Sequence, residues 1–165
     1  MSKKKQSALQ LIEFPFGKHL AGVTKLYVGA LRKRFEHLDL ERNYSVLILI
    51  ENTKQNCTQQ YIADFLRKDK TSMVGIVDTL VKKGYIKRIK NPLDRREHII
   101  QLTAKARKTL PEIHKGIHDL NLRTTKGLSK REVKRFHEIL ELMSDNLSRE
   151  PGYNIVANFE KAKPE

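Results

Sequence analysis

The stretch that decides the fold covers residues 58–103 and reads TQQYIADFLRKDKTSMVGIVDTLVKKGYIKRIKNPLDRREHIIQLT. Thr58 is a good N-cap for a short helix over about residues 59–67, and Asp69 is one for a second helix over residues 70–83. Gly84 predicts the end of the second helix, because glycine takes the left-handed conformation of a helix C-terminus at least cost. One apolar stripe with helical spacing runs along this helix, made of Met73, Ile76, Val77 and Leu80.

A change of composition after Gly84 predicts a β-hairpin. Residues 85–90 and 98–102 mix β-branched and basic side chains, and Asn91-Pro92 between them is a turn signal. Two short helices joined by a tight turn and followed by a basic hairpin are the parts of a winged helix-turn-helix. In that arrangement the second helix lies in the major groove of DNA, and its first turn reaches the base edges. Here that turn carries three hydrogen-bonding side chains, Lys70, Thr71 and Ser72.

Positive charge is concentrated in the same stretch. The chain has 33 Lys and Arg against 19 Asp and Glu, a net charge of +14, and residues 67–96 alone hold ten Lys and Arg against three Asp. Such a charge indicates a polyanionic partner, which is a nucleic acid, an anionic membrane surface or an acidic protein. A basic face that only keeps the protein soluble is the alternative. The position of the charge at the predicted helix-turn-helix favours DNA.

The flanking segments predict long helices and a mostly α fold. A helical apolar pattern precedes the motif at Leu20, Val23, Tyr27, Ala30, Leu31 and Phe35. After the motif, Thr103 is an N-cap for a helix with Ala106, Leu110, Ile113, Ile117 and Leu120 on one face, which Pro111 should bend. Ser129 and Glu132 then form a capping-box pattern ahead of a further amphipathic helix. The apolar run at residues 44–50 fits either a buried strand or a helix capped by Asn43.

Several other classes of protein are excluded by what the sequence lacks. At 165 residues, 39% of them hydrophobic and 32% charged, the chain is expected to fold as one domain. No run of about 20 apolar residues and no signal peptide is visible, and the one cysteine, Cys57, suits a reducing compartment, so we expect a cytoplasmic protein. A Gly-rich phosphate loop, a G-x-S-x-G elbow and an H-E-x-x-H motif are missing too. We therefore predict no enzyme activity, no cofactor, no metal and no membrane partner.

The motif resembles the multiple-antibiotic-resistance regulator (MarR) family. The similar features are Ala63 in the first short helix, the D-K-[ST]-[ST] start at residues 69–72, the V-D-x-L-x-x-x-G pattern at residues 77–84, and D-x-R in the hairpin ahead of a closing L-T. The segment LSKREVKRFHEILELMSDNL resembles the last long helix of the family. The resemblance covers roughly residues 10–148.

The resemblance implies which residues contact DNA. It places Asp94 and Arg96 where the family has an aspartate that orients an arginine entering the minor groove, whose narrow form attracts arginine. An ordinary ion pair at the hairpin turn is the alternative. The expected DNA-binding residues are Lys70, Thr71, Ser72, Gly75, Thr79, Lys90, Asp94, Arg95 and Arg96. Gly75 departs from the family, since many relatives have a long polar or basic side chain there. We therefore expect limited base readout, with backbone and hairpin contacts carrying more of the affinity.

The resemblance also implies a homodimer. It makes residues 10–42 and 103–148 dimerisation helices around a winged helix-turn-helix DNA-binding region at residues 43–102. A two-fold dimer presents two recognition helices one DNA turn apart, which predicts a pseudo-palindromic promoter site and a transcriptional regulator, most often a repressor. A sequence-tolerant architectural binder of nucleic acid is the alternative function. The segment 153–159 has apolar residues beyond a Pro-Gly break, and the alternatives are a frayed end, which we slightly favour, and an added contact to the dimer.

Further candidate sites have an ordinary structural explanation as well. Family members commonly bind small aromatic or anionic effectors, which here implies Phe16, His19 and Tyr44, with Phe14 nearby, although each also fits a core or interface. Cys57 could sense oxidants with help from Lys54 or be inert. His114 and His118 are four residues apart and could face one metal ion, or simply lie on a basic helix.

Overall fold

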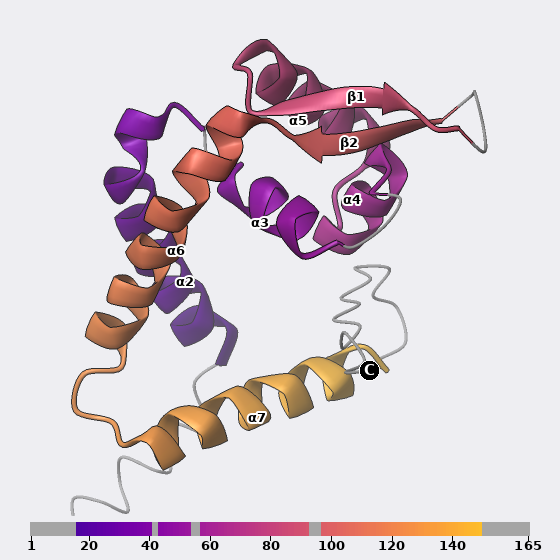
Figure 1. Cartoon of the computed structure of the whole chain (residues 1–165). Coiled ribbons are helices and arrows are strands. Elements are labelled where there is room, and N and C mark those ends of the chain that lie inside the picture. The colour runs from indigo at the N-terminus through magenta and orange to yellow at the C-terminus, as the bar shows by residue number, and fades with distance from the viewer. Residues whose placement is uncertain (1–15, 41–42, 54–56, 93–96, 150–165) are drawn as a thin grey trace, which may run out of the picture.

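The computed structural model describes residues 16–40, 43–53, 57–92 and 97–149, and it is mostly helical (Figure 1). Along the chain lie α2 (Phe16–Arg34), the 3-10 helix η1 (Glu36–Leu38), α3 (Tyr44–Asn52), α4 (Gln59–Leu66), α5 (Lys70–Lys82), β1 (Ile86–Lys90), β2 (His98–Leu102), α6 (Ala104–Thr124) and α7 (Lys130–Leu147). The predicted mostly α fold with a winged helix-turn-helix is confirmed.

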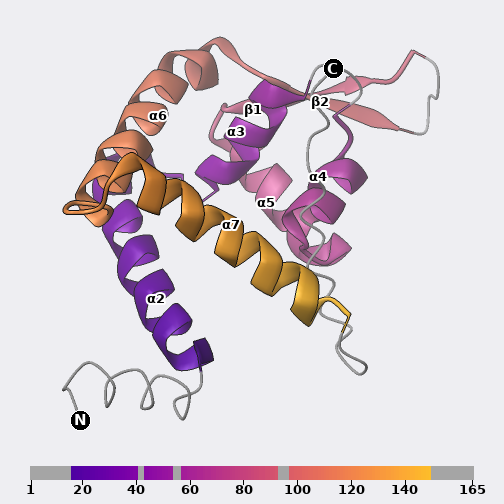
Figure 2. The same ribbon diagram turned by 90° about the horizontal axis from the view of Figure 1, so that it is seen from below.

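The elements from α3 to β2 form one body, which we call the head. Helices α2 and α6 pack against each other beside the head, and α7 crosses beneath them (Figures 1 and 2). Within the head, α5 lies behind the two-stranded sheet in the view of Figure 1 and contacts α4 and β1. The predicted helix-turn-helix and hairpin are thus adjacent on one side of the molecule.

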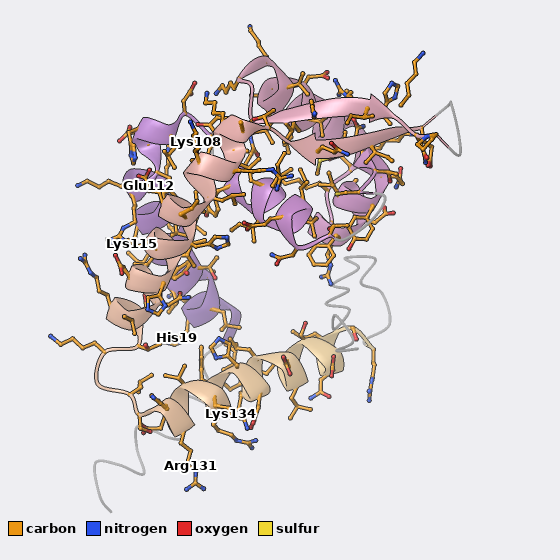
Figure 3. All side chains as sticks on the ribbon, in the orientation of Figure 1. His19, Lys108, Glu112, Lys115, Arg131 and Lys134 are labelled. Carbon is orange, nitrogen blue, oxygen red and sulfur yellow. The ribbon has the colours of Figure 1, made fainter. Side chains whose placement is uncertain are left out.

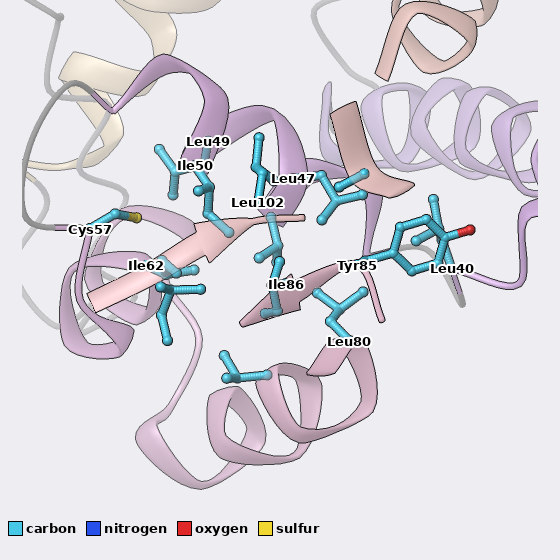
Figure 4. Close-up of a cluster of buried hydrophobic side chains, with 14 of the residues drawn as sticks. Leu40, Leu47, Leu49, Ile50, Cys57, Ile62, Leu80, Tyr85, Ile86 and Leu102 are labelled. Atoms are coloured by element: carbon cyan, nitrogen blue, oxygen red, sulfur yellow. The ribbon is translucent and has the colours of Figure 1, made fainter. Parts of the chain in front are cut away.

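One continuous hydrophobic core joins the head to α2 and α6. Figure 4 shows a part of this core around the hairpin, α3 and α5. The antiparallel hairpin pairs Ile86 with Leu102 and Arg88 with Ile100. Because residues two apart in a strand and directly paired residues share a face, Ile86, Ile100 and Leu102 lie together on the face that is buried in the core, whereas Arg88 lies at the exposed edge of that same face. Leu31 and Phe35 at the end of α2 join the same cluster. The head is therefore not an isolated lobe but shares its buried surface with α2 and α6.

The ambiguous apolar run at residues 44–50 is a helix. Val46, Leu47, Leu49 and Ile50 are all buried, since α3 contacts α4, β2 and α6 and so has apolar neighbours on several sides. A helix buried all round lacks the one-sided pattern that distinguishes a surface helix from a strand. Asn43 precedes this helix, but its side chain makes no capping hydrogen bond, so that prediction was wrong. The reason is its backbone, with φ −87° and ψ 16° instead of the extended conformation of a capping residue.

The other predicted helix ends are confirmed by their capping contacts. The Thr58 hydroxyl accepts from the backbone N–H of Tyr61 at 3.1 Å, and Thr103 caps α6 in the same way. Ser129 and Glu132 form the complete capping box of α7. Gly84 has φ +74°, the left-handed conformation expected of the residue that ends α5.

Helix α6 continues through Pro111 and is curved, as that proline predicts (Figure 2). One turn and a half later, Gly116 is buried where α6 crosses the end of α2. A Cβ atom at Gly116 would lie 2.5 Å from Cε1 of Phe35. The close packing of α2 on α6 therefore depends on this glycine.

No helix in the described part of the chain combines the length and the apolar character that crossing a membrane requires.

We predict that Gly116→Ala lowers the free energy of unfolding by about 1–3 kcal/mol, because the buried Phe35 ring must shift to admit the methyl group. Gly75→Ala is the matched control: its Cβ would meet no atom within 4 Å, so helix propensity should raise stability by up to about 1 kcal/mol. Urea denaturation followed by circular dichroism measures both. Equal effects of the two substitutions would contradict the assigned packing of α2 on α6.

Candidate nucleic-acid interface

The turn between α4 and α5 is short and fixed by hydrogen bonds. Arg67 ends α4 in the left-handed conformation with φ +50°, and the backbone N–H of Lys68 donates to the carbonyl oxygen of Ala63. Two residues later the Asp69 carboxylate accepts from the backbone N–H of Ser72 at 2.8 Å and begins α5. The turn thus sets the angle between the two helices through local contacts that the sequence encodes.

The predicted DNA-contacting residues of α5 lie on the face of the helix away from the core. Met73, Val77 and Leu80 are completely buried on the opposite face. The predicted contact residues at positions 70, 71, 72 and 75 are exposed, and the one at position 79 is half-buried. The helix is therefore anchored by one side and presents the predicted side chains to solvent on the other.

Electrostatics at the start of α5 differ from the simple expectation of a positive helix terminus. Hydrogen bonds from the side chain and backbone of Ser72 hold the pKa of the Asp69 carboxyl below its ordinary value. A charged cap therefore already occupies this helix N-terminus and offsets part of its attraction for phosphate. Lys70, exposed beside it, supplies the positive charge that a phosphate requires.

An ion pair connects α5 to the hairpin. Arg88 of β1 donates from Nη2 to Oδ1 of Asp78 at 2.6 Å. Arg88 lies on the same face of the hairpin as its paired residue Ile100, and it is exposed where that face meets α5. Lys90, at the end of β1, is exposed. The helix and the first strand of the hairpin therefore hold a defined relative position at the exposed surface.

A polar hollow of about 240 Å³ lies where the starts of α4 and α5 meet the hairpin. The backbone N–H of Ile100 donates to the carbonyl oxygen of Cys57 at 2.7 Å, which fixes the start of α4 against β2. The polar side chains that line the hollow are Thr58, Gln59, Gln60, Lys70, Arg88, Glu97 and His98.

Sequence reasoning selected only Lys70 of this set. Gln59, Gln60, Arg88 and His98 come from three separate segments, so their meeting depends on the register of the hairpin against α4 and α5. Gln59 and Gln60 at the start of α4 were the signal in the sequence that could have indicated this hollow, because the first turn of α4 faces the same side as the start of α5.

Three predicted site residues of the hairpin, Asp94, Arg95 and Arg96, lie outside the described residues, so their roles stay predictions. The same holds for Phe14, Lys54 and the segment 153–159.

The predicted effector residues lie at two ends of α2. Phe16 and His19 are exposed at its start. Tyr44 is half-buried at the start of α3, where its ring packs edge-on against Phe35 with 5.3 Å between the centroids. At about 1.5 Å of rise per residue, α2 separates the two groups by roughly 28 Å within one chain. The three residues therefore do not line one cleft of a single chain, and their role in effector binding stays a prediction.

The remaining candidates are held in structural contacts. Burial raises the pKa of the Cys57 thiol, which is only 4% exposed. Nε2 of His114 lies 2.6 Å from Oε2 of Glu51, an ion pair or hydrogen bond that joins α6 to α3. Within the described ranges, no group of three or more His, Cys, Asp or Glu side chains is arranged to hold a metal ion.

Comparisons with known proteins match the head to one family. The sequence profile of the MarR family matches residues 41–98. A curated relative, the HTH-type transcriptional regulator BilQ of Clostridium symbiosum, is 28% identical over 88 residues. This match covers 53% of the chain and 61% of the relative, so the chain spans less than two thirds of that protein's length.

The crystal structure of a MarR family transcriptional regulator from Rhodococcus superposes with a TM-score of 0.69 at 26% identity, covering 78% of this chain and 91% of the other. The head of the chain is therefore similar to the MarR family. CouR from Rhodococcus jostii, crystallised with p-coumaroyl-CoA, matches with a TM-score of 0.71 at 23% identity over 90% of this chain and 97% of the other, and shows a shared fold. MarR family relatives are named as transcriptional regulators and not as enzymes, in line with the sequence prediction.

We predict that Cys57 reacts with a thiol reagent such as Ellman's reagent only when the chain opens. At pH 8 the native protein should be labelled at least roughly 100-fold more slowly than the same protein unfolded in urea, because a buried thiol reacts through local opening. The absorbance of the released thiolate follows both reactions. Similar rates in the two states would show an accessible, reactive cysteine and would reopen the oxidant-sensing interpretation.

Proposed function

We propose that the chain is a homodimeric, sequence-specific regulator of transcription that binds double-stranded DNA at a pseudo-palindromic promoter site, most simply as a repressor. The observation that carries the proposal is the exposed face of α5, held by a buried core on its other side and flanked by the basic hairpin. A helix presented in this way fits the major groove of B-form DNA. The regulators similar to this chain support the same function.

Dimerisation is supported by the exposed apolar surfaces of α2 and α7. None of the eighteen residues of α7, all of them described, is buried within one chain. Large apolar side chains stay exposed on this helix and on α2, namely Phe16, Leu20, Val23, Leu26, Phe136, Ile139, Leu142 and Leu147. Exposed apolar area on this scale favours burial in an interface. A second copy of the chain provides matching faces, and two-fold symmetry would then present two heads to one DNA molecule.

Release by a small aromatic or anionic effector is a further part of the proposal, supported by the family resemblance. Tyr44 is the best placed of the predicted residues, because it packs against Phe35 where the end of α2 meets the head. A ligand inserted beside this contact would act on the arrangement of the head relative to the outer helices. Such a change would alter the spacing of the two recognition helices.

The test is selection from random duplex DNA, followed by anisotropy titration of the selected duplex and a scrambled control at several salt concentrations. We expect a pseudo-palindromic duplex bound by two chains in sedimentation, at least about 10³-fold more tightly than the control. An architectural binder, which Gly75 and the large net charge favour, would instead bind both duplexes with similar affinity and steep salt dependence. A monomer at micromolar concentration would contradict the dimer.

The contribution of each lysine side chain to DNA affinity should depend on its position in the fold. Lys70→Ala is expected to weaken binding to all duplexes and to reduce the slope of log affinity against log salt by about 1 for each chain bound. Lys115→Ala is the matched control, because Lys115 is an exposed lysine of α6 and lies away from the head (Figure 3). An equal loss for the two variants would mean that total charge, and not the surface of α5, determines binding.

Arg96→Ala tests whether Arg96 of the hairpin enters the minor groove, as the D-x-R motif implies. The substitution should weaken binding and relax any preference for A·T-rich flanks, since arginine favours a narrow minor groove. Titration of duplexes with A·T-rich and G·C-rich flanks measures this preference. Unchanged affinity and unchanged preference would show that Arg96 does not enter the groove.

A further inference from the structure

One apolar side chain interrupts the polar surface of the recognition helix. Among the thirteen residues of α5, all of them described, Val74 is the large apolar residue that is exposed, with 39% of its surface accessible. A single exposed apolar residue is common on protein surfaces, so exposure alone assigns it no role. Its position is informative, because it lies on the second turn of the helix that the proposed function places in the major groove.

The neighbours of Val74 leave it accessible to a flat surface such as the edge of a base pair. Thr71 lies one turn before it on the same side of the helix, and Gly75 beside it has open space, with no atom within 4 Å of the Cβ position. One turn later, the Asp78 carboxylate is held by Arg88 at 2.6 Å. No long, unengaged side chain therefore stands on this second turn between Val74 and an approaching DNA groove.

The chemistry of the groove then determines what such a surface can read. Thymine is the one base that presents a methyl group in the major groove, and apolar side chains recognise it by contact. The absence of a side chain at Gly75 allows the helix backbone to approach the base edges closely. The second turn also lacks an arginine, asparagine or glutamine, the residues that read guanine or adenine with paired hydrogen bonds.

We infer that Val74 is a specificity-determining residue that recognises the C5 methyl group of a thymine in each half-site, with Gly75 permitting the close approach. The inference rests on the proposed function and deepens it. The glycine that removes a polar base-reading side chain thereby leaves an apolar mode of recognition in its place. Specificity at this position comes from burying a methyl group and not from a hydrogen bond.

The experiment replaces each thymine of the selected duplex in turn with deoxyuridine, which lacks only the methyl group, symmetrically in both half-sites. Wild-type protein should lose affinity at one position, by about fourfold per half-site, the value expected for one buried methyl group. Val74→Thr, which keeps a γ-methyl group, should retain this discrimination. Val74→Ser, which lacks it, should bind the thymine and deoxyuridine duplexes equally well.

Two controls separate the possible failures. Thr79→Ala alters the other flank of α5 and should keep the discrimination between thymine and deoxyuridine, whatever its total affinity. Circular dichroism of each variant checks that the exposed substitutions leave the fold intact. If no duplex is selected at all, the proposed function itself fails. If a specific duplex is found but the deoxyuridine effect is absent, or persists unchanged in Val74→Ser, this inference alone is overturned.

Discussion

The arrangement of the whole molecule depends on the three residues that follow α5. Gly84 turns the chain with φ +74°, and the hydroxyl of Thr103, at the start of α6, donates to its carbonyl oxygen at 2.7 Å. On one side of this glycine, Nζ of Lys83 donates to the Asp39 carboxylate at 2.9 Å, beyond the end of α2. On the other side, Tyr85 is buried and begins the hairpin. This junction thus fixes α5, the hairpin, the end of α2 and the start of α6 relative to one another.

Through this junction the proposed DNA-reading surface and the proposed dimer surface would belong to one rigid unit. The hydrophobic core is continuous from the head into α2 and α6, so the head cannot turn without disturbing buried contacts. A homodimer formed through α2 and α7 would therefore set the separation of its two recognition helices. A ligand bound near Phe35 and Tyr44, or at the proposed dimer interface, would act on these same contacts.

The sequence predicted features that depend on neighbouring residues and missed those that depend on tertiary contacts. Thr58 and Asp69 were predicted as caps because a cap acts over three residues of chain. The run at residues 44–50 stayed ambiguous because its burial on several sides comes from α4, β2 and α6. Arg88 was missed because its position beside Asp78 follows from the packing of β1 on α5, a tertiary contact that the sequence pattern does not specify.

Hydrogen–deuterium exchange of the full chain with and without its selected duplex tests the central claim most directly, since it locates the DNA on the protein. We predict that DNA slows exchange at the starts of α4 and α5 and along the hairpin, while the middle of α6 and the length of α7 exchange at the same rate in both states. Protection concentrated on α6 and α7, with none at α5, would contradict this prediction and would place the nucleic acid on the outer helices.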